Sequence, residues 1–82
     1  MAGDIDFYFP LVRCLMERGQ FELTQILASA WLVTLEDDEA VISFTGPHRH
    51  YRDALARPAM IRHLRDAIDF LVGRPVGIRI VI

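Results

Sequence analysis

The spacing of hydrophobic residues changes three times along this chain of 82 residues, and these changes constrain the fold more than any other feature. Residues 59–72 place hydrophobic side chains at helical spacing, with polar residues on the opposite face. Three segments are instead rich in β-favouring residues and largely follow a period of two, which is typical of strands. They are residues 31–35, 40–45 and 76–82. Both periods within one short chain predict an α+β domain.

The first helix is predicted from a short hydrophobic stripe. Leu11 and Leu15 lie one helical turn apart, and Gly19 provides a stop. Pro10 suits the first turn of a helix, because its missing N–H would be unpaired there. We therefore expect residues 1–9 to be a lead-in and the helix to begin at Pro10.

The other helices follow from similar signals. Residues 21–30 and 47–56 predict two short helices, and Pro58 begins the long one, which ends at Gly73. The expected order is α-α-β-β-α-α-β, in one domain that covers residues 10–82, because a chain of this length supports a single core.

The strands are expected to form a three-stranded antiparallel sheet with helices on one face. Four acidic residues, 36–39, separate the first two strands and predict a solvated hairpin turn, which we prefer to a calcium site because no fixed ligand spacing is present. The third strand is expected to pair beside residues 31–35, which would leave the outer strands as edges. The predicted core contains Trp31, Phe44, Leu64, Ile68, Leu71 and Ile78.

Composition limits the classes of protein to which the chain can belong. It is 52% hydrophobic, and its mean hydropathy of +0.25 predicts that apolar surface remains for a partner. No apolar run approaches the roughly 18 residues needed to cross a bilayer, so we expect no membrane partner. The single Cys14 cannot close an intrachain disulfide, which favours a cytoplasmic protein.

Residues that could support catalysis are few. Neither Ser29 nor Ser43 lies in a glycine-flanked elbow, and no glycine-rich phosphate loop is present. His48, His50 and His63 could in principle share zinc, but two helical residues two positions apart point about 200° away from each other. We expect hydrogen-bonded or solvated histidines, no cofactor, no metal site and no enzymatic activity.

Charge is distributed unevenly along the chain. Residues 1–47 contain eight acidic residues and two arginines, a net −6, whereas residues 48–65 contain five arginines and one aspartate, a net +4. Arg62 with Asp66, and likewise Arg65 with Asp69, have the spacing of helical ion pairs. The candidate partner-binding residues of this basic segment are Arg49, Tyr51, Arg52 and Arg62.

The segment LASAWLVTLEDDEAVISFTGPHRHYRDALARPAMIRHLRDAIDFLVGRPVGIRIVI resembles the small C-terminal, KH-like domain of the gamma/tau subunit of bacterial DNA polymerase III, the clamp-loader organiser. The acidic turn and the ending with Gly73, Pro75, Val76 and Ile78 are the most specific matches. The N-terminal domain of the initiator DnaA is related to that family. The resemblance implies a small KH-like fold and a noncatalytic docking domain of the replication machinery. It does not imply RNA binding by a GxxG clamp, because residues 46–49 read GPHR.

We therefore expect a protein-interaction domain that docks onto a replisome partner, such as the polymerase catalytic subunit or the helicase. One alternative is a module that binds single-stranded or duplex nucleic acid through residues 48–65. Another is a self-associating structural subunit, which the hydrophobic last residues favour.

Overall fold

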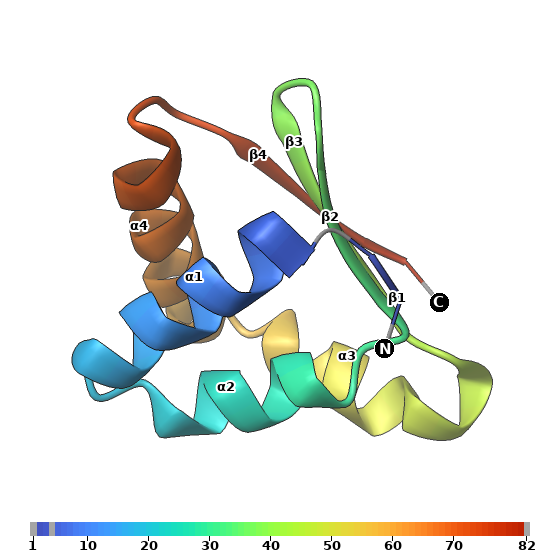
Figure 1. Ribbon diagram of the computed structural model, residues 1–82. Helices are drawn as coiled ribbons and strands as arrows, with labels where there is room; N and C mark the ends of the chain where they lie inside the picture. Colours follow the sequence, from blue (N-terminus) through green and yellow to red (C-terminus); the bar gives the residue numbers. More distant parts are fainter. Residues whose placement is uncertain (1, 4, 82) are drawn as a thin grey trace.

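A computed structural model describes residues 2–3 and 5–81 and shows an α+β domain (Figure 1). The helices are α1 (Ile5–Glu17), α2 (Phe21–Ala28), α3 (Arg49–Leu55) and α4 (Pro58–Val72), and a 3-10 turn, η1 (Gly46–His48), precedes α3. The strands are β1 (Ala2–Gly3), β2 (Leu32–Glu36), β3 (Glu39–Ser43) and β4 (Gly77–Val81). The predicted fold class and the predicted order α-α-β-β-α-α-β are confirmed, with β1 as an added two-residue strand. No helix in these residues is long and apolar enough to cross a membrane.

The sheet is mixed, so the prediction of a fully antiparallel sheet is wrong. Its strand order is β1-β2-β3-β4, with β2 antiparallel to β3 and the outer strands parallel to their neighbours. Strand β1 occupies the position beside β2 that was expected for the last strand. The register shows this, since Ala2 pairs with Leu32. Helices α3 and α4 carry the chain back to the start of β3, where Gly77 pairs with Glu39, and β4 therefore runs parallel to β3.

The helices cover one face of the sheet, as Figure 1 shows. Val33, Ala40 and Ile42 point to this covered face and are buried, because side chains alternate between the two faces of a strand. Ile78 and Ile80 share the face through their register with β3 and pack against the same core half-buried. The core therefore lies between the sheet and the helical layer.

Helix α1 begins at Ile5, so the prediction that it begins at Pro10 is wrong. Phe7 is buried and lies one turn before Leu11, so the hydrophobic stripe extends further towards the N-terminus than expected. Burial of this stripe outweighs the loss of the one helical hydrogen bond that Pro10 cannot donate. Met1 and Asp4 of the expected lead-in, and Ile82 of the expected last strand, lie outside the described residues.

Most of the predicted core is confirmed, but Trp31 is 55% exposed and does not belong to it. Trp31 lies in a bend before β2, and its neighbour Ala30 takes the buried position. Phe44, Leu64 and Ile68 are buried, and Leu71 and Ile78 pack half-buried against them. Alternating polarity thus indicated the strand correctly but extended it one residue too far.

Candidate partner-binding surface

The four residues predicted to bind a partner lie on two helices. Arg49, Tyr51 and Arg52 are on α3, whereas Arg62 is on the exposed side of α4. Among the described residues, no hydrogen bond or ion pair joins Arg62 to the other three. The structure therefore groups three of the predicted residues and leaves Arg62 apart from them.

The Tyr51 side chain has a defined environment. Its ring lies 4.1 Å from the His50 ring and 5.8 Å from the His48 ring, measured between centroids, and it packs half-buried against the core. His48 is itself fixed by a hydrogen bond of 2.9 Å between its Nδ1 and Thr45 Oγ1. Pro47 at the start of η1 favours this local turn. A partner would meet a tyrosine that has already lost much of its conformational freedom.

The arginines of this segment differ in how far they are neutralised. Arg52 donates to its neighbour Asp53 at 2.9 Å, and Arg57 donates to Glu22 of α2 at 3.1 Å, which ties the end of α3 to α2. Arg49 is exposed and has no polar side-chain partner within the described residues. Arg49 is therefore the α3 arginine that is most available to an acidic group.

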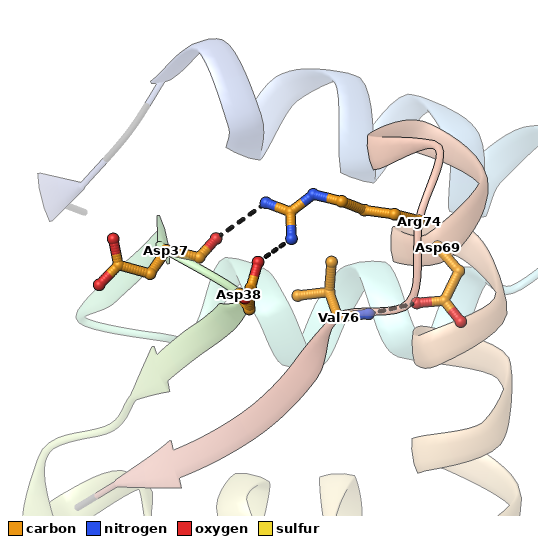
Figure 2. Close-up of polar contacts among 5 residues, drawn as sticks. All are labelled: Asp37, Asp38, Asp69, Arg74 and Val76. Carbon is orange, nitrogen blue, oxygen red and sulfur yellow. Dashed lines mark hydrogen bonds and ion pairs between the residues drawn. The ribbon is translucent and has the colours of Figure 1, made fainter.

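The predicted ion pairs along α4 are wrong. Across the described residues, Arg62 does not pair with Asp66, and Arg65 does not pair with Asp69. Asp69 Oδ1 instead accepts a hydrogen bond of 3.1 Å from the backbone N–H of Val76, where the chain turns from α4 into β4 (Figure 2). A partly buried backbone donor competes better for this carboxylate than an exposed guanidinium does.

Trp31 adds an exposed aromatic side chain that the sequence had assigned to the core. Its backbone N–H donates to the Ser43 carbonyl at 2.7 Å, so it lies at the end of the sheet from which η1 begins, three residues further on at Gly46. Figure 1 shows α3 next to this end of the sheet. We call this region the α3 end, comprising Trp31, Arg49, His50, Tyr51 and Arg52. The sequence predicted Arg49, Tyr51 and Arg52 of this region, but the only signal that Trp31 belongs to it is its position between a predicted helix and a predicted strand.

The three histidines have separate surroundings. His48 contacts Thr45, His50 contacts the Tyr51 ring, and His63 lies on α4. In residues 2–3 and 5–81, no group of three or more His, Cys, Asp or Glu side chains could hold a metal ion.

The acidic hairpin turn is held by an arginine far away in sequence, as Figure 2 shows. Arg74 pairs with the Asp38 carboxylate and donates to the Asp37 carbonyl at 3.1 Å. The predicted hairpin is confirmed, with Asp37 in the left-handed region at φ 52°. A surface hollow of about 580 Å³ adjoins this contact, but its Arg74 and Asp69 are already engaged within the chain. These charges therefore serve the fold.

Other exposed hydrophobic side chains lie on α1, α2 and α4. Phe9, Met16, Phe21 and Phe70 are each more than half exposed. The Arg18 guanidinium lies 5.3 Å from the centroid of the Phe70 ring, within the range of a cation–π contact. The described residues thus have apolar surface beyond the α3 end.

Comparison with family models, with curated protein sequences and with solved structures finds no match to this chain.

Proposed function

We propose that this chain is a noncatalytic protein-interaction domain whose α3 end docks onto a protein of the bacterial replication machinery in the cytoplasm. The observation that carries the proposal is the exposure of Trp31 at the same end of the sheet as Arg49 and Tyr51. Trp, Tyr and Arg are the residue types most enriched among those that dominate binding energy in protein interfaces.

The surroundings of these side chains support the same function. Tyr51 and Trp31 supply apolar area at low conformational cost, because each has few rotatable bonds. Arg49, which has no polar side-chain partner within the described residues, lies on α3 with Tyr51, where its positive charge favours an acidic partner and speeds its association. The arrangement combines apolar contact with a charged margin, as protein interfaces do.

The replication context comes from the resemblance of about residues 10–82 to the C-terminal domain of the gamma/tau subunit. The shared order of elements and the fold class support the assignment to a small docking domain. In that context the partners to test first are the polymerase catalytic subunit and the replicative helicase.

The experiment measures binding of the full chain to each purified protein by isothermal titration calorimetry. We expect Trp31→Ala and Arg49→Glu each to weaken binding by at least tenfold, about 1.4 kcal/mol. Arg13→Glu is the matched control, because it makes the same charge change on α1, where Arg13 pairs with Glu17 at 3.2 Å. Binding that both α3-end variants retain would contradict the proposed surface.

Nucleic-acid binding is the second candidate, because Arg49, Arg62 and Arg65 have no ion-pair partner within the described residues. It is tested with a fluorescent single-stranded and a duplex oligonucleotide at 50 and 200 mM salt. Affinity that falls steeply over this range would favour nucleic acid, since neutralised phosphates release counterions. Protein docking through Trp31 and Tyr51 predicts a weak dependence on salt.

A further inference from the structure

The free edge of β4 is a second surface, separate from the α3 end. The strand reads GIRIV, and among the described strands it pairs with β3 alone. Natural edge strands are usually protected by lysine, proline or a bulge, which limits pairing with another chain. Within Gly77–Val81 the single charged residue is Arg79, and Glu39 of the same sheet neutralises it at 3.0 Å.

Two hydrogen bonds establish which backbone groups of β4 are free. Gly77 N–H donates to the Asp38 carbonyl and the Val81 carbonyl accepts from Phe44 N–H, both at 2.8 Å. Because alternate residues of a strand direct their N–H and C=O groups to opposite sides, Arg79 also faces β3. Ile78 and Ile80 therefore direct their backbone groups outward, away from the sheet.

We propose that two copies of this chain pair through β4, antiparallel, about a two-fold axis at Ile80. In this arrangement, Ile80 of each copy exchanges both backbone hydrogen bonds with Ile80 of the other. An antiparallel pair requires outward-facing residues to oppose outward-facing residues, so registers that set Ile78 or Ile80 against Arg79 or Val81 are excluded. The axis is therefore perpendicular to the sheet, and the helices of both copies cover the same face.

The side chains favour Ile80 over Arg79 as the position of the axis. Pairing about Arg79 would set two arginines directly opposite each other. Each is paired with Glu39 of its own sheet, which offsets part of its charge, but like charges in that position are still destabilising. Pairing about Ile80 instead sets Arg79 opposite Val81, which is 37% exposed on the same face. The Ile80 side chains then meet at the edge of the covered face, where Ile80 already packs against the core.

The charge distribution favours a second copy as the occupant of this edge. The hairpin at the start of β4 carries the Asp37 carboxylate, which has no ion-pair partner within the described residues, while its neighbour Asp38 is already paired with Arg74. At the other end, His48 and Arg49 follow the end of β3, which lies beside Val81. Antiparallel pairing brings the acidic end of each copy towards the basic end of the other. The two β3 strands lie about three strand spacings apart in this arrangement, ~14 Å. At that distance the attraction between the two ends is weak and is screened by salt, so it orients the two copies but adds little binding energy.

The first test is sedimentation equilibrium of the full chain over a range of concentrations. We expect the mass to rise from 9.4 kDa towards twice that value. Ile80→Pro removes the outward N–H but no bond to β3, and we expect it to weaken dimerisation at least tenfold. Ile80→Val, the control, retains the dimer. A chain that stays monomeric at every concentration, or an equally strong dimer of Ile80→Pro, would overturn the proposal.

A cross-linking experiment tests the register without a proline. In a Cys14→Ala background, chains with Arg79→Cys are mixed with chains carrying Val81→Cys and then oxidised. We expect a disulfide between the two kinds of chain and much less product from Arg79→Cys alone. Efficient cross-linking of Arg79→Cys to itself, or none in the mixture, would overturn pairing about Ile80.

Discussion

Two large side chains on α4 provide a direct test of where the core lies. Leu64 is fully buried, whereas Phe70, six residues later on the same helix, is 70% exposed. Removal of a buried leucine side chain costs about 3–5 kcal/mol, from lost hydrophobic transfer and from the cavity that remains. A chain of 82 residues has a total stability of roughly 4–12 kcal/mol, so Leu64→Ala removes a large part of it.

The expected change in melting temperature follows from the chain length. An unfolding entropy of about 2.1 cal/mol/K per residue gives ~0.17 kcal/mol/K for this chain. A loss of 3 kcal/mol therefore lowers Tm by about 17 °C. The Phe70 side chain buries little apolar area, and alanine is the better helix former. We therefore expect Phe70→Ala to change the free energy of unfolding by at most ~1.5 kcal/mol.

The assay is urea unfolding followed by circular dichroism, with thermal melts of the same samples. Leu64→Ala should lower the urea midpoint much more than Phe70→Ala does. Equal midpoints for the two variants, or a loss below about 1 kcal/mol for Leu64→Ala, would refute the packing of α4 against α1 in the core.

Three further predictions concern single positions. Gly73→Ala should cost about 1 kcal/mol in thermal unfolding, because Gly73 has φ 79° while an added Cβ meets no atom within 4 Å. Arg74→Ala should lower stability by at most about 1 kcal/mol, since its contacts with the hairpin are exposed, and amide exchange near Asp38 should increase. Acrylamide should quench Trp31 fluorescence almost as efficiently as that of free tryptophan, and strong protection would mean that the indole is buried.

The local features of the fold were predictable from the sequence because they depend on near neighbours. Pro58 and Gly73 bound the long helix as expected, and the acidic residues form the hairpin turn. Hydrophobic spacing likewise located the ends of β2, β3 and β4 to within two residues.

The strand order was not predictable in the same way. The order depends on β1, a two-residue strand that is too short to show any period. Because β1 pairs with the outer side of β2, the position left for β4 is beside β3. The start of α1 was missed for a related reason, since burial of Phe7 overrides the local signal of Pro10.

The candidate site was only partly predictable. The basic and aromatic residues of α3 are adjacent in sequence, so their proximity was expected. The exposure of Trp31 and the use of Asp69 by Val76 both depend on how distant segments meet, which periodicity does not report. These two differences change which side chains are free to bind a partner.

The parallel pairing of β3 with β4 joins residues that are 38 positions apart, as Glu39 and Gly77 are. Since such distant segments associate slowly, β4 is expected to dock late in folding, after the local β2-β3 hairpin. Until it docks, or if proteolysis removes it, β3 is an exposed edge strand with unpaired backbone groups and the hydrophobic residues Ala40, Val41 and Ile42. The last strand therefore also acts as a safeguard against aggregation of the strand that it covers.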